Sequence, residues 1–282
     1  MIPVILTIAG SDSSAGAGIQ ADLKAISATG GYGATAITAI TAQNTRGVTR
    51  ALELEPALIR DQIAAVFDDL PVAAVKSGML ASSRVIETVA EALAARPAPP
   101  YVLDPVMVSK SGFPLLEPAA VDALRRLLLP RATLVTPNVH EAAALTGLPV
   151  RTPADAEAAG RRLVDAGAAA VLVKGGHLEV SPATDVLVTP AGVRRFPGEH
   201  LDARHTHGTG CTYSAAIATL LAHGRPLEDA IAVAKRYLTE AIRDGLPIGG
   251  GIGPTDPFFY LRRPGAAAAW LERLAGAGAT AR

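Results

Sequence analysis

The sequence contains little of several features that mark other classes of protein. Among its 282 residues there is one cysteine, Cys211, so no disulfide can form within the chain. No run of residues approaches the roughly 20 consecutive apolar positions that a membrane-spanning helix needs. The formal net charge is zero, which excludes the strongly basic surface typical of nucleic-acid binding. We therefore expect neither a membrane nor a nucleic acid as a partner.

The N-terminal segment 1–9 is apolar but carries no basic flank, and a turn rich in glycine and serine follows it directly. This pattern predicts a first strand rather than a signal peptide. Together with the single cysteine, it leads us to expect a cytoplasmic protein.

Short apolar segments alternate with segments of helical spacing along most of the chain. After the first strand, further strands are predicted at 32–40, 73–77, 101–103, 134–136 and 170–174, and a hairpin at 184–196. This alternation predicts an α/β fold with a central, mostly parallel β-sheet flanked by helices on both faces. We expect a single domain over residues 1–262. A short helix around Trp270 and a mobile tail are expected within residues 263–282.

Ligands of open α/β sheets bind beyond the carboxyl ends of the strands, so polar residues that follow strands are candidates for a site. They include an acidic pair, two lysines and two glycine-rich turns, found at Gly10–Gly18, Gln43–Asn44, Lys76–Gly78, Asp104, Thr136–Glu141, Lys174–His177 and Thr206–Thr212. We predict that these segments converge on one rim of the sheet.

The glycine-rich segment 206–212 is the most informative of them, because a helix follows it directly. Its glycines allow several backbone N–H groups to point the same way, and the helix dipole adds positive potential there. The pattern predicts an anion hole suited to a phosphoryl group in transit. Taken alone, the segment is more typical of an ordinary loop before a helix.

The run His207–Cys211 resembles the anion-hole signature of ribokinase-like kinases, in the branch that contains the hydroxymethylpyrimidine and pyridoxal kinases. The segments at 9–22, 41–47, 138–141 and 174–177 are similar to other motifs of that family, in the same order. The resemblance implies a ribokinase-like fold and an ATP-dependent kinase that uses Mg²⁺ and phosphorylates a pyrimidine alcohol and then its monophosphate. It departs from the family at Ser13 and Ala15, which carry no reacting group, and at Gly250, where a histidine is common in the family.

The resemblance implies a catalytic role for Cys211, where many family members carry an aspartate that acts as base. Gly208, Thr209 and Gly210 would stabilise the moving phosphoryl group, and Lys174 would neutralise nucleotide phosphates. A cysteine at a helix N-terminus should have a depressed pKa, which would make the thiol a proton acceptor. By itself, a small residue at a helix start would be an equally good interpretation.

The resemblance also implies five residues that would bind the alcohol substrate, which accepts the phosphoryl group, at one end of the site. The Gln43 amide offers an acceptor beside donors, which matches the edge of an aminopyrimidine. Similarity to the family places Gly10 and Asp22 near the substrate hydroxyl. Met79 and Val106 match apolar residues of the pyrimidine pocket, although plain core packing would explain them as well.

At the other end of the site, the resemblance implies nucleotide binding by Thr136, Glu141, Lys174 and Gly208. Asp104 and Glu141 form an acidic pair, and Mg²⁺ prefers such oxygen ligands together with water and substrate phosphates. A capping role for Glu141 at the start of a helix is the alternative. The family usually forms homodimers, so we expect one here.

Two other functions remain open at this point. A pyridoxal kinase is the first, although the second cysteine that some pyridoxal kinases carry in a lid is absent from this sequence. The second is a catalytically silent sensor that binds pyrimidines, against which the acids, Lys174 and the predicted anion hole argue.

Overall fold

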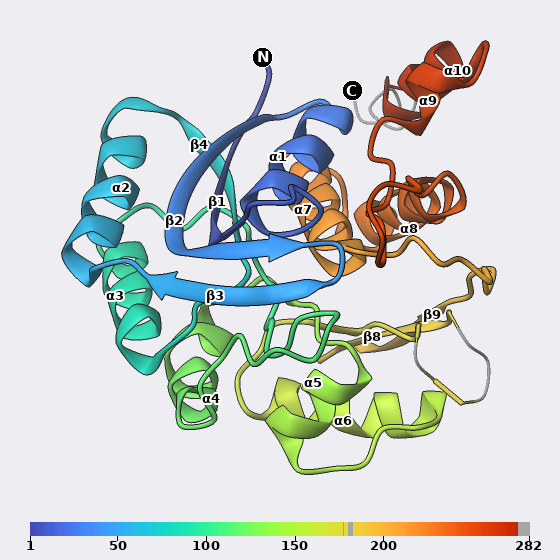
Figure 1. The fold of residues 1–282 in the computed structure, drawn as a ribbon. Coiled ribbons are helices and arrows are strands. Elements are labelled where there is room, and N and C mark those ends of the chain that lie inside the picture. Colours follow the sequence, from blue (N-terminus) through green and yellow to red (C-terminus); the bar gives the residue numbers. More distant parts are fainter. Residues whose placement is uncertain (177, 180–182, 276–282) are drawn as a thin grey trace.

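The computed structural model describes residues 1–176, 178–179 and 183–275 (Figure 1). Its strands are, in chain order, β1 (Val4–Asp12), β2 (Tyr32–Asn44), β3 (Gly47–Glu53), β4 (Val72–Ser77), β5 (Tyr101–Leu103), β6 (Leu134–Val135), β7 (Val171–Val173), β8 (Asp185–Thr189) and β9 (Gly192–Phe196). In this part of the chain they form one sheet in the order β3-β2-β1-β4-β5-β6-β7-β8-β9. Strands β2, β1, β4, β5, β6 and β7 run parallel, whereas β3, β8 and β9 pair antiparallel with their neighbours. The predicted mostly parallel sheet and the predicted hairpin are confirmed.

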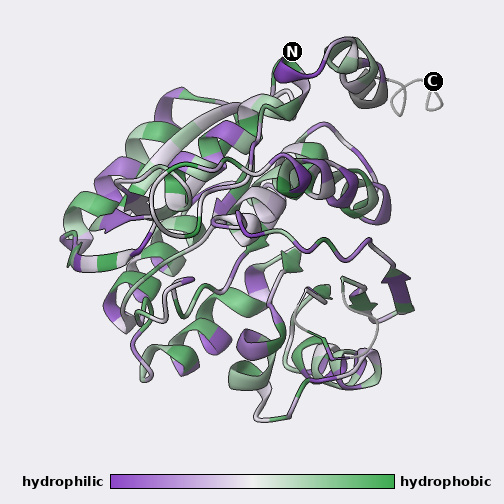
Figure 2. Ribbon diagram, turned by 45° about the vertical axis from the view of Figure 1, so that its right-hand side comes forward, coloured by the Kyte–Doolittle hydropathy of each residue, from purple (hydrophilic) through white to green (hydrophobic). Residues whose placement is uncertain are grey.

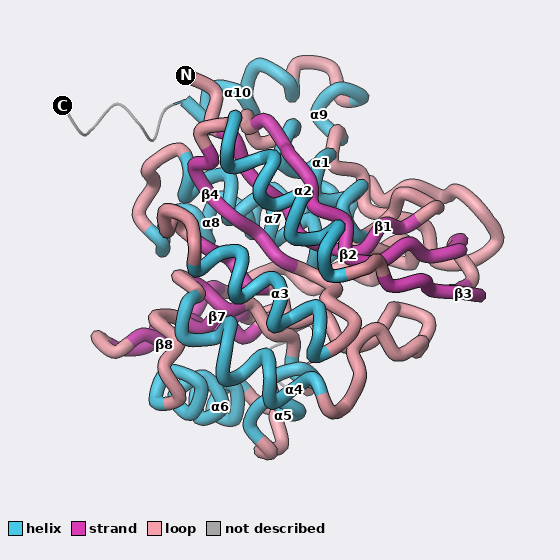
Figure 3. Tube along the Cα trace, turned by 90° about the vertical axis from the view of Figure 1, so that its left-hand side faces the viewer, coloured by secondary structure: helices cyan, strands magenta, loops and turns pink. Residues whose placement is uncertain are grey.

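Helices cover both faces of this sheet (Figure 3). They are α1 (Gly18–Ala28), α2 (Pro56–Asp69), α3 (Ser83–Ala94), α4 (Ala120–Ala123), α5 (Val139–Thr146), α6 (Pro153–Asp165), α7 (Thr209–Ala222), α8 (Leu227–Arg243), α9 (Phe259–Arg262) and α10 (Ala266–Ala275). Helix α4 continues through a π-helical turn, Leu124–Leu128, and a 3-10 turn, Leu129–Arg131. One apolar core joins the sheet to α2 through α6, and a second joins it to α1, α7, α8, α9 and α10.

Successive side chains along a strand point to opposite faces of the sheet, so neighbouring residues pack into different cores. Val102 packs into the core under α7, while its neighbour Leu103 packs into the core under α3 and α5. Ile5 and Leu6 are divided in the same way. A strand that is buried on both faces needs apolar residues at every position, which is why these segments read as continuous apolar runs. The covering helices each have one apolar face, and their ribbons alternate between green and purple in Figure 2.

The β2–β3 hairpin differs from the prediction. Strand β2 continues to Asn44, beyond its predicted end at residue 40, and pairs with β3, so Gln43 lies on a strand rather than after one. Strand β3 is an edge strand whose residues are exposed or half-buried along its whole length. It therefore lacks the apolar alternation from which a strand is recognised in a sequence. Figure 3 shows the ends of β2 and β3 reaching out beyond the helices.

The predicted C-terminal helix is present as α10, and it is anchored to the domain. The Trp270 ring stacks on Tyr237 with the ring centroids 5.3 Å apart, and its indole N–H donates to the Ala28 carbonyl at 3.0 Å. The tail that was predicted to be mobile lies largely outside the described residues, as does His177. Within the described ranges, no helix combines the length and the hydrophobicity required to span a membrane.

Candidate active site

A cavity of about 790 Å³ opens at the carboxyl ends of the parallel strands. It is large enough for a small-molecule substrate together with part of a nucleotide. Most of the residues predicted from the sequence line it: Gly10, Gln43, Met79, Asp104, Val106, Glu141, Lys174, Gly208, Thr209, Gly210 and Cys211. The structure thus brings segments from β1 through α7 onto one rim.

The turn before α7 has a conformation that only glycine adopts easily. Gly208 is the N-cap of α7, with φ 78° and ψ 9°. A Cβ atom at this residue would lie 1.8 Å from the carbonyl oxygen of Gly16, in the loop between β1 and α1. The close approach of these two loops leaves room for nothing larger than glycine. The first N–H groups of a helix have no partner within the helix. In α7 the Thr209 N–H donates to the Thr206 carbonyl at 3.3 Å, and the next two residues, Gly210 and Cys211, line the cavity.

Acidic and basic side chains meet at this helix start. The Lys174 ammonium donates to Asp104 Oδ1 at 2.7 Å and lies 4.0 Å from Glu141 Oε2. A Cβ atom on Gly210 would lie 3.3 Å from Lys174 Nζ and 3.5 Å from Asp104 Oδ2. Ser214, one turn further along α7, donates to Asp104 Oδ2 at 3.2 Å. The lysine and the acidic pair therefore adjoin the predicted anion hole directly.

The charge states of these groups depend on one another. Burial disfavours the Asp104 carboxylate, but Lys174 and Lys76 outweigh it and hold the pKa of Asp104 below its usual value. Burial raises the pKa of Glu141 to about 7, and the charge of Asp104 adds to this effect while Lys174 opposes it. The pKa of Lys174 is raised by both acids despite burial. The two carboxylates thus share the Lys174 ammonium, and Lys76 adds to its effect on Asp104.

Asp104 and Glu141 form an incomplete set of metal ligands. In the part of the chain that the structure describes, no cluster of three or more histidine, cysteine or acidic side chains could hold a metal ion. A magnesium ion that is shared with a nucleotide needs only one or two carboxylates, because phosphate oxygens and water complete its shell. The residues present therefore fit such an ion, and do not fit a metal held by protein alone.

Cys211 lines the cavity, but its predicted depressed pKa is wrong. Burial raises the pKa of the Cys211 thiol to about 12, and Asp22 and Asp104 add to the rise, against the lowering by Lys76. A helix N-terminus stabilises a nearby charge by only about 0.3–1 kcal/mol at exposed sites. Desolvation of the sulfur and two nearby carboxylates outweigh this effect, so the side chain is a neutral thiol at physiological pH.

We predict that Cys211 reacts slowly with iodoacetamide. A free cysteine with a pKa of about 8.5 is roughly a quarter ionised at pH 8, whereas a thiol with a pKa near 12 is ionised to about 0.01%. Alkylation of the folded protein at pH 8 should therefore be roughly 2000-fold slower than alkylation of the same protein unfolded in urea. Mass spectrometry gives an unambiguous readout because there is one cysteine. Equal rates in the two states would contradict the raised pKa.

Asp22 lies beneath the cavity wall, which corrects its predicted contact with substrate. Its side chain is fully buried and accepts from Lys76 Nζ at 2.8 Å on both oxygens, and from Thr7 Oγ1 at 2.6 Å. Lys76 is also fully buried, and the prediction that it lies on the rim is therefore wrong. A Cβ atom on Gly78 would lie 2.9 Å from Lys76 Nζ, which places this ion pair directly under the segment that leads to Met79.

Thr136 is likewise absent from the cavity wall, contrary to its predicted contact with the nucleotide. The residue is fully buried, and its hydroxyl lies 3.3 Å from Asp104 Oδ1. Its backbone N–H donates to the Leu103 carbonyl at 2.9 Å. Thr136 therefore supports Asp104 from behind rather than meeting a ligand.

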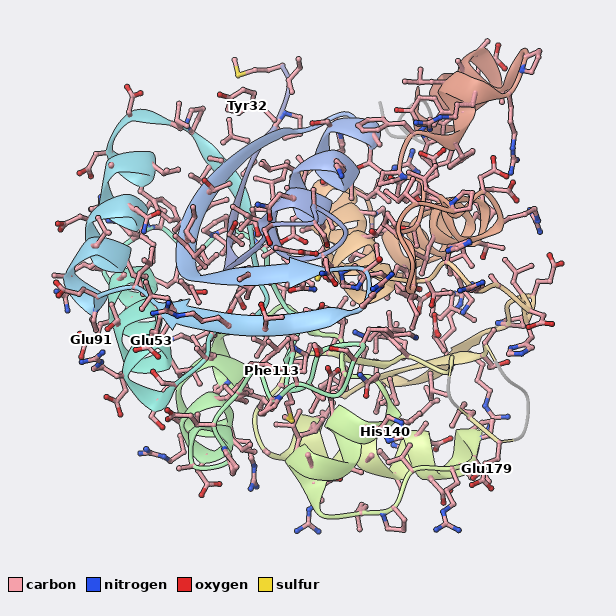
Figure 4. All side chains as sticks on the ribbon, in the orientation of Figure 1. Tyr32, Glu53, Glu91, Phe113, His140 and Glu179 are labelled. Carbon is pink, nitrogen blue, oxygen red and sulfur yellow. The ribbon has the colours of Figure 1, made fainter. Side chains whose placement is uncertain are left out.

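The acceptor end of the cavity combines apolar and polar walls. A Cβ atom on Gly10 would lie 2.8 Å from the sulfur of Met79, so glycine at this position allows the methionine to pack against β1. Val106 and the loop that follows β5 form another wall. Figure 4 shows Phe113 on this loop and His140 at the start of α5, both below strand β3 in that view. His140 itself lines the cavity.

Two polar clusters at the cavity were not predicted as site residues. At one end, Asp12 and Thr41 surround Gln43 together with His207. The Asp-Ser sequence that follows Gly10 could have indicated a turn in which the carboxylate binds backbone N–H groups. The side-chain partners of Thr41 and His207, however, depend on the pairing of β1 with β2 and on the position of the loop before α7.

The second cluster lies at the opposite end of the cavity. Lys235 on α8 forms an ion pair with Asp185 at 2.7 Å, and the Tyr213 hydroxyl donates to the same carboxylate at 2.9 Å. The other oxygen of Asp185 accepts from the Gly175 N–H at 2.9 Å, directly after Lys174. These residues are far apart in the sequence, so no local pattern could have indicated that they meet.

Comparison with known proteins identifies the family to which the sequence is similar. The family described as phosphomethylpyrimidine kinase matches residues 12–256. A hydroxymethylpyrimidine/phosphomethylpyrimidine kinase from Streptomyces coelicolor is 49% identical over 254 residues, which cover 90% of this chain and 94% of that protein. The thiamine biosynthesis bifunctional protein ThiED from Geobacter sulfurreducens is also 49% identical, over 252 residues, but the chain spans only about half (51%) of that longer protein.

Solved structures give the same fold. The ADP complex of pyridoxal kinase from Bacillus subtilis superposes with a TM-score of 0.85 at 36% identity, covering 93% of this chain and 100% of that one. A phosphomethylpyrimidine kinase from Clostridium difficile gives a TM-score of 0.76 at 44% identity, covering 86% and 100%. The ribokinase-like fold expected from the sequence is confirmed.

Proposed function

The chain belongs to the phosphomethylpyrimidine kinase family, and on that basis we propose that it is an ATP-dependent kinase of thiamine biosynthesis. Its substrate is 4-amino-5-hydroxymethyl-2-methylpyrimidine, which it converts to the monophosphate and then to the diphosphate. The observation that carries the proposal is the anion-hole turn at Gly208, which adjoins Lys174 and Asp104 in a cavity that Gln43 lines from the other end.

The geometry suits phosphoryl transfer because that reaction depends mainly on positioning and charge stabilisation. In a loose transition state the charge is spread over the oxygens of the transferring group. The first amides of α7 and the Lys174 ammonium are held in place before the substrate arrives, so they stabilise this charge without reorganisation. Asp104 and Thr136 keep Lys174 in its position.

Asp104 and Glu141 would hold a magnesium ion together with the nucleotide phosphates. When bound, such an ion neutralises phosphate charge and orients the leaving group. The residues of the chain provide the rest of the electrostatic environment. Lys174 balances the acidic pair, and Ser214 holds the second oxygen of Asp104.

The acceptor alcohol would bind between Gln43, Met79 and Val106 and point toward Cys211. The neutral thiol of Cys211 would position the alcohol oxygen by hydrogen bonding rather than remove its proton in the ground state. A loose transition state makes this sufficient, because the attacking oxygen loses its proton late in the reaction. For the second phosphorylation, an oxygen of the monophosphate would take the place of the alcohol.

A coupled assay of ADP release tests the proposal against pyridoxal kinase activity, which structural similarity to a pyridoxal kinase keeps as the second candidate. The purified protein should release ADP with the aminopyrimidine alcohol, and mass spectrometry should identify its mono- and diphosphate. Turnover of pyridoxal without turnover of the pyrimidine would overturn the choice. Binding of either compound without ADP release would support a non-catalytic sensor.

The remaining expectations concern the protein as a whole. We propose that residues 1–262 form a single kinase domain, that the protein is a homodimer, and that it works in the cytoplasm. The close packing of Trp270 on Tyr237 supports extending the folded unit into α10. Light scattering of the purified protein measures the oligomeric state directly.

A further inference from the structure

Gln43 belongs to a chain of hydrogen bonds that crosses the acceptor end of the cavity. Its amide nitrogen lies 3.1 Å from His207 Nε2, and its amide oxygen lies 3.1 Å from the Thr41 hydroxyl. The same His207 nitrogen lies 2.9 Å from Asp12 Oδ2. Asp12, Thr41 and His207 are all buried, so each of their polar atoms needs a suitable partner within the protein.

Asp12 determines which nitrogen of His207 carries a proton. The carboxylate accepts from the Ser14 N–H and hydroxyl on Oδ1, and from the Gly16 and Ala17 N–H groups on Oδ2. Burial opposes ionisation, but these donors and His207 hold the pKa of Asp12 below its usual value. An ionised carboxylate only accepts hydrogen bonds, so the His207 Nε2 that faces it must carry a hydrogen.

The hydrogen on His207 Nε2 is incompatible with the Gln43 amide nitrogen that faces it. Nε2 of His207 and Nε2 of Gln43 would both be donors directed at each other across 3.1 Å. On the other side, the single hydroxyl proton of Thr41 would face two acceptors, the Gln43 amide oxygen and the Ser11 carbonyl at 3.0 Å.

A half-turn of the amide about its last side-chain bond satisfies every group. The Gln43 oxygen then accepts from the His207 N–H, which is shared with Asp12. The Gln43 nitrogen then donates to the Thr41 oxygen, and the Thr41 hydroxyl donates to the Ser11 carbonyl. Exchange of oxygen and nitrogen leaves the shape of the side chain unchanged, so the hydrogen-bond network alone decides between the two arrangements.

We propose that His207 and Asp12 set the orientation of the Gln43 amide, and thereby select the edge of the pyrimidine that binds. The two residues act through Gln43 and are positioning residues rather than catalytic ones. Once the network is formed, the amide has one lone pair left on its His207 side and one N–H left on its Thr41 side. A ligand must therefore present a donor toward His207 and an acceptor toward Thr41.

The orientation decides where the reacting arm of the substrate points, and this step depends on the proposed function. In the aminopyrimidine alcohol, the ring nitrogen, the amino-bearing carbon and the hydroxymethyl-bearing carbon follow one another around the ring. If the amino group binds the oxygen on the His207 side, the hydroxymethyl arm lies further in that direction. His207 directly precedes the anion-hole turn 208–211, so the arm is directed toward Cys211. The opposite amide orientation would direct it away.

The proposal is tested by comparing the amino substrate with its 4-oxo counterpart, in which the donor and acceptor of this edge are exchanged. The wild-type protein should prefer the amino compound in kcat/KM by roughly 100-fold, as expected for a matched bidentate amide contact. His207→Phe keeps a planar ring but removes the N–H, so the amide can turn and the preference should fall below about 10-fold. His207→Gln supplies an N–H at a similar reach and should retain most of the preference.

Two further variants separate orientation from general damage. Thr41→Val removes the acceptor at the other end of the network and should reduce the preference as His207→Phe does. The Ser13 hydroxyl donates to the backbone carbonyl of Gln43 and accepts from its backbone N–H, both at 2.8 Å. Ser13→Ala therefore loosens the backbone at Gln43 but leaves the partners of its side-chain amide in place. It should lower kcat/KM for both compounds in equal proportion.

The outcomes distinguish this proposal from the proposed function. If the wild-type protein phosphorylates neither pyrimidine, the proposed function fails and the orientation argument fails with it. If the wild-type protein is active and folded His207→Phe and Thr41→Val keep the full preference for the amino compound, the proposed function stands and the orientation argument is overturned.

Discussion

Gly208→Ala is expected to lower kcat by a factor of about 1000, because the new methyl group cannot coexist with the closed anion-hole turn. The Cβ atom would lie 1.8 Å from the Gly16 carbonyl oxygen, about half of an ordinary contact distance. The loop before α7 must therefore move away from the loop after β1. The amides that we propose to stabilise the transferring phosphoryl group move with it, so the substrate should no longer meet a preformed site.

Gly224→Ala is the matched control for this variant. Gly224 follows the other end of α7 with φ 80°, close to the 78° of Gly208, but nothing lies within 4 Å of its added Cβ. Both variants carry the same backbone strain of roughly 1–2 kcal/mol, but Gly208→Ala carries the clash in addition. Gly224→Ala should therefore lower the Tm by a few degrees, and Gly208→Ala by more. Only Gly208→Ala should lower kcat. A Gly208→Ala protein that keeps more than a tenth of wild-type kcat would contradict the role of the turn.

Removal of Lys174 and Asp104, singly and together, is expected to separate stability from catalysis. Lys174→Met leaves the buried Asp104 carboxylate without its 2.7 Å partner, and Asp104→Asn leaves the Lys174 ammonium without its own. Loss of one partner of a buried ion pair costs about 3–5 kcal/mol in unfolding free energy. The double variant removes both charges, so its stability should recover toward that of the wild type.

Turnover should behave differently from stability in this series. Each single variant loses a group that stabilises or holds the phosphates, so kcat should fall by about 100- to 1000-fold. The double variant should be equally inactive although it is more stable than either single variant. Urea denaturation and kcat, measured on the same preparations, give both quantities. Recovery of kcat together with stability would show that the pair is structural only.

The surface pair Arg161–Glu157 provides the reference for this series. It has a similar distance of 2.8 Å, but its two side chains are 54% and 30% exposed. Removal of either partner should change the unfolding free energy by less than about 0.5 kcal/mol and leave kcat unchanged. A similar cost at both pairs would mean that burial contributes little to the effect at Asp104.

The sheet could be predicted from the sequence where it is buried, and not where it is exposed. Strands such as β5, with Val102 in one core and Leu103 in the other, require apolar residues at consecutive positions, and this leaves a clear pattern. Strand β3 is an edge strand with little burial and leaves none. The consequence was local, because the missed strand changed only the setting of Gln43, which lies on a strand of a hairpin rather than after the end of a strand.

The active site was predictable as a set of segments, but the depth of each side chain was not. Helix starts and strand ends determine which segments reach the rim, and these can be read from local patterns. Whether a polar residue faces the cavity or lies beneath it depends on packing between distant segments. Asp22 and Thr136 are fully buried for this reason, with partners at Lys76 and Asp104 that no spacing in the sequence indicates.

The charge state of Cys211 illustrates the same limit. Its place at a helix start was correctly predicted, and that place alone favours a thiolate. The desolvation of its sulfur, and the proximity of Asp22 and Asp104, arise only from the folded chain and reverse the direction of the pKa shift. Local sequence gives the smaller of the two contributions.

A time course followed by ³¹P NMR tests most directly whether one cleft performs both phosphorylations. With excess ATP and the aminopyrimidine alcohol, the monoester signal should rise first and then decline as the diphosphate signals appear, and Gly208→Ala should slow both steps to a similar extent. Formation of the diphosphate from added monophosphate at the wild-type rate in Gly208→Ala, while the first step is lost, would contradict a single shared site.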